Sequence, residues 1–151
     1  MSDVSHDQAL QLMAVPKLCS TSLVWSNRDN HVGLLLALAQ PEDESGAILP
    51  GLTLQLEIKR PIVVDRCLYE FGLFLLEHSV RRRAYQLNVS PADKRSHNGK
   101  VGAMYKPHEH VGNQVLPIDD PDIACGRPDV ALALYCSRIS LAYSNSFNSP
   151  V

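Results

Sequence analysis

The stretch Leu52-Thr53-Leu54-Gln55-Leu56-Glu57-Ile58-Lys59 places an apolar side chain at every second position. A period of two is typical of a β-strand that buries one of its faces, because successive side chains of a strand point to opposite sides of the sheet. The sequence therefore predicts a half-buried strand over 52–59.

Four further segments predict strands around this one. Residues 21–26 and 32–38 are rich in β-forming residues and flank the turn-like 27–30, which indicates an antiparallel hairpin. Residues 62–76 are richly apolar. Their length favours a helix, whereas their valines and aromatic residues favour a strand bent at Gly72, and we prefer the strand. Alternation over 83–89 predicts another strand, which leads into a turn at 90–93.

The two ends of the chain predict helices. Ser5 precedes a short apolar repeat that Pro16 stops, and Pro128 precedes apolar positions that recur every three or four residues up to Ala142. A short edge strand is expected around Pro117. We therefore predict an α+β fold, with a mainly antiparallel sheet of about five or six strands, a C-terminal helix packed on one face and a short N-terminal helix.

Length and composition favour one domain over 1–151. The 151 residues are 45% apolar, which suits a single core. Residues 1–16 form the N-terminal helix or extension, and 144–151 are expected to be flexible. The start of the chain has no secretory pattern, and no run approaches the roughly 20 apolar residues of a membrane span. We expect a cytoplasmic protein that does not bind membranes.

The four cysteines fit that compartment. None belongs to a Cys-x-x-Cys pair, and each has apolar neighbours, so we interpret all four as reduced core residues: Cys19, Cys67, Cys125 and Cys136.

Positive charge is concentrated between Arg81 and Lys106. This stretch holds seven of the 14 lysines and arginines and one acid, Asp93, so it carries +6 while the rest of the chain carries −8. Such a patch suits an anionic or phosphate-containing partner, whereas the overall charge of −2 argues against a general DNA-coating role. The candidate phosphate-binding residues are Arg81, Arg82, Arg83, Lys94, Lys100 and Lys106. For Arg81 to Arg83 a solvated hairpin end is an equal alternative.

The histidines of the same region form the candidate site. On a strand, His108 and His110 would face one surface about 7 Å apart, and a loop carrying His97 could fold over them. Neutral imidazoles could bind a divalent metal ion, with Glu109, Asp93 or a carboxylate distant in the chain completing the shell. Without a metal, the same imidazoles could act as general acid and base.

The metal-free version describes a ribonuclease. One histidine would take a proton from a ribose 2′-hydroxyl and a second would protonate the leaving 5′-oxygen. Arg95, Lys94 or Lys106 would stabilise the phosphoryl charge, and Tyr105 could stack on a base. The alternative is that the three histidines are ordinary surface residues. His31 and His78 stand alone near turns, which favours structural roles.

Gly102 followed after five residues by His108-Glu109-His110 resembles the start of the cupin metal signature. The glutamate expected next is replaced by 113–115, and no second motif follows, so a cupin is not expected.

The order of elements resembles that of the TumE-like toxins of bacterial toxin–antitoxin loci and their uncharacterised relatives. In those chains a strand like Tyr85-Gln86-Leu87 leads through a polar loop to a His-x-His pair followed by glycine, here His108, His110 and Gly112, and a helix closes the domain. The resemblance covers residues 52–143 in layout. It implies a small cytosolic toxin that is paired with an antitoxin and acts on RNA or a related nucleotide. The first fifty residues and 115–122 depart from that pattern, which leaves partner and target open.

Three functions remain open from the sequence. The first is an anionic-ligand or nucleic-acid site, ribonuclease-like, built from His97, His108, His110, Arg95 and Tyr105. The second is a non-catalytic interaction or inhibitor protein of a phage or other mobile element, which would use the basic patch. The third is a metal-binding protein that uses His97, His108 and His110. No cofactor is expected apart from a divalent ion in this third case.

Overall fold

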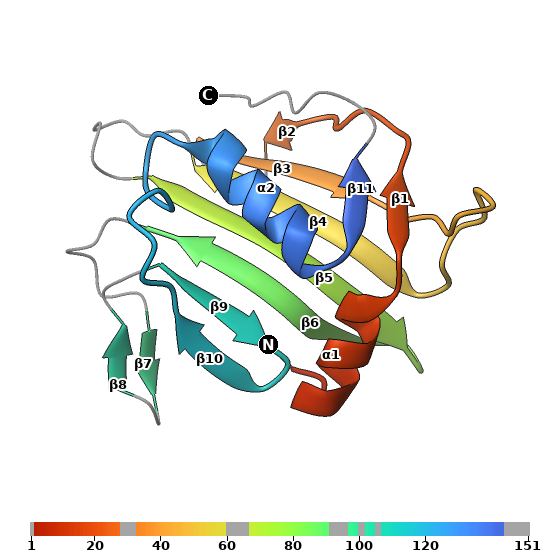
Figure 1. The fold of residues 1–151 in the computed structure, drawn as a ribbon, viewed down its shortest axis with the longest axis horizontal. Helices are drawn as coiled ribbons and strands as arrows, with labels where there is room; N and C mark the ends of the chain where they lie inside the picture. The colour runs from red at the N-terminus through yellow and green to blue at the C-terminus, as the bar shows by residue number, and fades with distance from the viewer. Residues whose placement is uncertain are drawn as a thin grey trace.

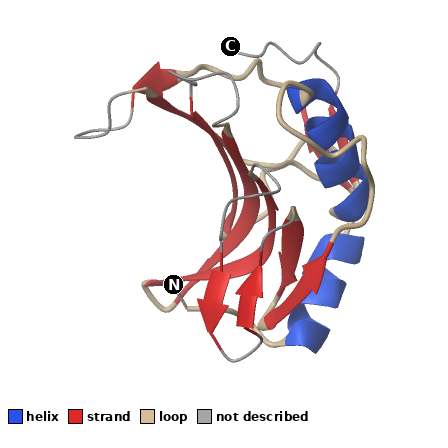
Figure 2. Cartoon of the chain, turned by 90° about the vertical axis from the view of Figure 1, so that its left-hand side faces the viewer, coloured by secondary structure: helices blue, strands red, loops and turns tan. Residues whose placement is uncertain are grey.

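The computed structural model describes residues 2–27, 33–59, 67–90, 97–99, 102–104 and 107–143, and for 97–99 and 102–104 it describes the backbone alone. A seven-stranded antiparallel sheet runs in the order β10-β9-β6-β5-β4-β3-β2, and both helices lie on one of its faces (Figures 1 and 2). The predicted α+β class and mainly antiparallel sheet are confirmed, with more strands than expected.

The sheet is formed by β2 (Ser26–Asn27), β3 (Leu34–Ala39), β4 (Leu52–Lys59), β5 (Leu68–Glu77), β6 (Val80–Val89), β9 (His108–Val111) and β10 (Gln114–Pro117). A separate parallel pair joins β1 (Lys17–Cys19) to β11 (Leu141–Tyr143), and β7 (His97–Gly99) pairs with β8 (Gly102–Met104). The helices are α1 (His6–Ala14) and α2 (Pro128–Arg138).

The alternation of β4 determines which face of the sheet is apolar. Leu54, Leu56 and Ile58 are buried and lie opposite Leu73, Phe71 and Tyr69 of β5, in that order. The strand predicted within 62–76 is present from Leu68 onward, and 60–66 lie outside the described residues. The aromatic residues Tyr69, Phe71 and Phe74 therefore indicated the right structure, and segment length did not.

Helix α2 covers the apolar face. Ala131, Leu132 and Tyr135 are its buried residues, and Pro128 stands in the first turn, where its missing N–H costs nothing. The Tyr135 hydroxyl donates a 2.7 Å hydrogen bond to the Gly72 carbonyl of β5. This bond satisfies a buried polar group and fixes the helix on the sheet.

Helix α1 ends at a buried lysine. Ser5 caps its start by accepting from the Gln8 amide, as the sequence indicates. The Lys17 ammonium, 2% exposed, donates to the carbonyls of Leu12, Met13 and Val15 at the helix end and to that of Ile139 after α2. Burial lowers the pKa of Lys17 to about 8. One cation thus caps carbonyls from two helix ends.

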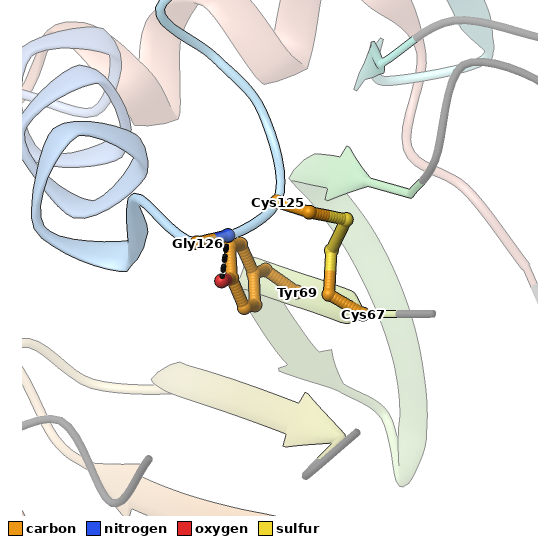
Figure 3. The surroundings of a disulfide bond; sticks show 4 residues. All are labelled: Cys67, Tyr69, Cys125 and Gly126. Carbon is orange, nitrogen blue, oxygen red and sulfur yellow. Dashed lines mark hydrogen bonds between the residues drawn. A yellow bond between two sulfur atoms is a disulfide. The ribbon is translucent and has the colours of Figure 1, made fainter. Parts of the chain in front are cut away.

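A disulfide corrects the expectation for two cysteines. Cys67 and Cys125 are bonded, with their Cα atoms 5.6 Å apart, and beside them the Gly126 amide donates to the Tyr69 hydroxyl (Figure 3). Apolar neighbours in sequence reveal burial but not pairing, which depends on how the 118–127 segment crosses the start of β5. Cys19 and Cys136 are unbonded thiols, and burial raises the pKa of Cys136 to about 11.

Neither α1 nor α2, the helices of the described part of the chain, is long and apolar enough to cross a membrane.

Candidate functional site

The face of the sheet opposite the helices carries polar side chains instead of a second apolar layer. Strand alternation and the pairing of β4, β5, β6 and β9 place them together. We call this surface the polar face, and it comprises Gln55, Glu57, Glu70, Gln86, Asn88, His108 and His110.

Strand register arranges these residues in rows. Glu57 pairs with Glu70, Glu70 with Asn88, and Asn88 with His108, so one row crosses four strands. The adjacent row contains Gln55, Gly72, Gln86 and His110 in the same strand order. Directly opposed residues on one face have Cβ atoms about 5 Å apart, so each row is continuous.

Several of these polar groups are buried. The exposed fractions are 4% for Glu57, 1% for His108 and 5% for His110. Removing ionisable groups from water is costly, and a hydrophobic core does not require them on this side. Clustered buried ionisable groups are therefore candidates for a functional site.

The two histidines of β9 share this side of the strand, as their spacing predicts. Their ring centroids lie 5.1 Å apart with an interplanar angle of 70°. Asn88 Nδ2 lies 3.3 Å from His108 Nε2, and an amide nitrogen can only donate. The tautomer and charge of the His108 ring decide whether this contact is a hydrogen bond.

Glu109 lies on the opposite side of the same strand. Its Oε1 accepts from the Tyr85 hydroxyl at 2.8 Å and from Arg138 Nε at 2.9 Å. Burial and the Glu109 carboxylate raise the pKa of Tyr85, and the hydrogen bond with Glu109 raises that of Arg138. Glu109 therefore belongs to a structural network under the helices, and the suggestion that it completes a metal shell with His108 and His110 is wrong.

Two of the three arginines of the predicted basic cluster contact the polar face. Arg81 donates to Gln55 Oε1 and lies 4.0 Å from the Phe74 ring centroid, and Gln55 Nε2 in turn donates to Glu57 at 2.6 Å. Arg83 donates to Gln86 Oε1 at 2.8 Å, and it also pairs with Asp3 at 2.8 Å. The side chain of Arg82 is exposed.

The other predicted site residues are not placed at the polar face. Lys94, Arg95, Lys100, Tyr105 and Lys106 lie outside the described residues. His97 begins β7 within what was expected to be a loop, and its backbone alone is described.

The two histidines interpreted as structural are not part of this face. His78 is exposed in the β5–β6 turn, and His31 lies outside the described residues. In the described ranges no three histidine, cysteine, aspartate or glutamate side chains come together as metal ligands.

The sequence did not reveal the polar residues of β4, β5 and β6 as part of the site. Glu57, Gln86 and Asn88 sit at the alternate positions of strands, which is also the pattern of an ordinary solvent face. One signal could have identified them. If the predicted strands pair in the order in which they occur in the chain, the polar positions of three of them align with His108 and His110.

No family model matches the chain, and it matches no curated protein or solved structure.

Proposed function

We propose that the polar face binds RNA or a related phosphate-containing ligand and cleaves it without a metal ion. The observation that supports this most strongly is the gathering of two imidazoles, two carboxylates and three side-chain amides on the face that the hydrophobic core does not use. Arg81 and Arg83 touch the same face and supply positive charge for phosphate oxygens. The predicted contributions of His97, Lys94, Arg95, Lys100, Tyr105 and Lys106 remain part of this proposal.

The contact between the two histidine rings bears on how protons would be transferred. In RNA cleavage a base removes the proton of the 2′-hydroxyl, the 2′-oxygen forms a bond to phosphorus, and an acid protonates the departing 5′-oxygen. The products are a 2′,3′-cyclic phosphate and a 5′-hydroxyl. The base and the acid must stand on opposite sides of the phosphate, but the rings of His108 and His110 are 5.1 Å apart and in edge contact.

Glu70 is better placed than His110 to be the second member of an acid–base pair with His108. It shares the row of His108 and lies two strands away, which separates the backbones by about 10 Å at the usual strand spacing. Asn88 lies between them in the same row, so a phosphate group that contacts both side chains would bind over the Asn88 amide. We assign Glu70 as general base and a protonated His108 as general acid, with His110 beside it.

Burial of His108 imposes a condition on this mechanism. At 1% exposure its ring can meet a substrate only after a local opening of the protein. We therefore expect slow turnover that is limited by opening.

The biological setting follows from the resemblance to TumE-like toxins and stays a proposal. A toxin of this kind would have a protein antitoxin as partner and RNA as target. The expected cytoplasmic location is part of the same proposal, whereas the Cys67–Cys125 disulfide favours an oxidising compartment.

The test is cleavage of a short 5′-labelled RNA in the presence of EDTA, with products identified by mass spectrometry. We expect a 2′,3′-cyclic phosphate as product. The cleavage rate should fall by about 100-fold or more in His108→Ala and in Glu70→Gln. His78→Asn is the matched control because it removes an exposed histidine from a turn with positive φ, which asparagine tolerates. Cleavage that requires a divalent ion, or that survives both site variants, would refute the mechanism. RNA binding without cleavage, weakened by Arg81→Ala, would favour the interaction-protein alternative.

A further inference from the structure

Two unsatisfied polar atoms lie next to each other at the end of the polar face. In the part of the chain that the structure describes, the buried side-chain atoms without a hydrogen-bond partner are Asn88 Oδ1 and Ser90 Oγ. Asn88 lies near the end of β6, and Ser90 directly follows the last residue of that strand. Buried polar atoms are normally paired, so two neighbouring exceptions indicate groups that a ligand satisfies.

Ser90 also lines a cavity of about 340 Å³. The cavity is bounded by Pro107, Ile118, Pro121 and Ile123, which make its walls largely apolar, and by the carboxylate of Asp120. Of the lining residues, Ser90 and Ile123 are each 3% exposed, and Asp120 is exposed. The volume suits a small organic group.

The polar groups around this space are mainly hydrogen-bond acceptors. The carboxylates of Asp119 and Asp120 can only accept, and Ser90 Oγ can do either. Asp120 Oδ1 already accepts from the Asp122 amide at 2.9 Å, which orients the carboxylate. A phosphate diester has no N–H or O–H to donate, and a carboxylate would repel it, so the cavity suits a neutral group that carries N–H donors.

A nucleobase combines those donors with apolar ring faces. Guanine presents two adjacent N–H groups on one edge, the geometry that a carboxylate accepts with both oxygens. The apolar walls would contact the ring, as apolar side chains do in other base pockets.

We propose that this cavity is a nucleobase subsite that prefers guanine. The proposal rests on the proposed function for its source of bases, because two residues that line the cavity, Ser90 and Pro107, are close in the chain to Asn88 and His108 of the polar face. Pro107 directly precedes His108, and Ser90 follows Asn88 by two residues, one past the end of β6. A base held in the cavity would place its ribose and phosphate beside His108, which makes the cavity the determinant of where RNA is cut.

The experiment is a titration of the full chain with guanosine. Calorimetry measures the binding, and amide chemical shifts locate it. Guanosine has no phosphate, so binding does not depend on the cleavage chemistry. We expect saturable binding with shifts at Ser90, Ile118 and Ile123, and weaker binding of inosine, which lacks the 2-amino group. Ser90→Ala should weaken guanosine binding about 5-fold, the effect of one hydrogen bond. The matched control is Ser137→Ala, which removes an exposed hydroxyl from α2.

Ser90→Ala also has a predicted effect without ligand. Because the hydroxyl is buried and unpartnered, its removal should leave the melting temperature unchanged or raise it. Destabilisation together with unchanged guanosine binding would show a structural role and overturn the proposal. Failure of guanosine to bind a protein that cleaves RNA would overturn the subsite alone. Guanosine binding by a protein that does not cleave RNA would support the subsite and refute the proposed function.

Discussion

Removing the Cys67–Cys125 disulfide should cost a large share of the stability of this protein. The bond closes a loop with a sequence separation of 58 residues. Restricting the unfolded chain by a loop of this length contributes about 4 kcal/mol in the chain-entropy treatment. Domains of this size are typically stable by about 5–15 kcal/mol, so the bond supplies a quarter or more of the total.

The appropriate variant is Cys67→Ala/Cys125→Ala, because serine at the buried position 67 would add an unsatisfied hydroxyl. Urea unfolding followed by circular dichroism gives the free energy of unfolding, and we expect a melting temperature about 10 °C lower. The control is Cys136→Ala, which removes a half-buried thiol that is not bonded.

The disulfide should also stabilise the cavity. Cys125 directly follows Ala124, which lines the cavity, so the double variant should bind guanosine less tightly as well as unfold more easily. Four reactive thiols in the native, unreduced protein would contradict this account, as would a double variant whose stability falls no further than that of the control.

Three other predictions concern the core and the helix ends. Because the pKa of Lys17 falls from 10.5 in the unfolded chain to about 8 on folding, the unfolded state holds this proton more tightly. Stability should therefore rise between about pH 8 and 10.5 in urea titrations, and Lys17→Met should abolish the rise. Glu109→Gln removes the ion pair with Arg138 and should lower the free energy of unfolding by about 1–3 kcal/mol while RNA cleavage is unchanged; lost cleavage with intact folding would place Glu109 in the site. Gly72→Ala puts a Cβ 2.5 Å from a Phe74 ring carbon and should cost about 1–3 kcal/mol in calorimetry, and an unchanged melting temperature would show that the ring moves freely.

Local periodicity was sufficient to predict most of the architecture. The alternation in 52–59, the capped repeat after Ser5 and the repeat after Pro128 each gave an element that the structure contains, because each depends on interactions within one segment. The hairpin of β2 and β3 is also present, although β2 is only two residues long. The number of strands was underestimated because short strands such as β1 and β11 are stabilised by their partners and have no period of their own.

The candidate site could be predicted only in part. Two histidines two residues apart share a face in any strand, and this followed from sequence. The identity of the strand beside β9 did not follow from the sequence. The alignment of Asn88, Glu70 and Glu57 with His108 was therefore not predicted. The disulfide was not predicted for the same reason, because the path of a loop brings Cys67 and Cys125 together.

The central claim is that the polar face binds nucleic acid, and amide chemical-shift mapping with a short RNA that carries 2′-O-methyl groups tests it most directly. Such an RNA cannot be cleaved through its 2′-oxygen, so the measurement reports binding alone. We predict that the largest shift changes fall on Glu57, Glu70, Asn88 and His108. Changes confined to α1 and α2, or no saturable change, would contradict the account.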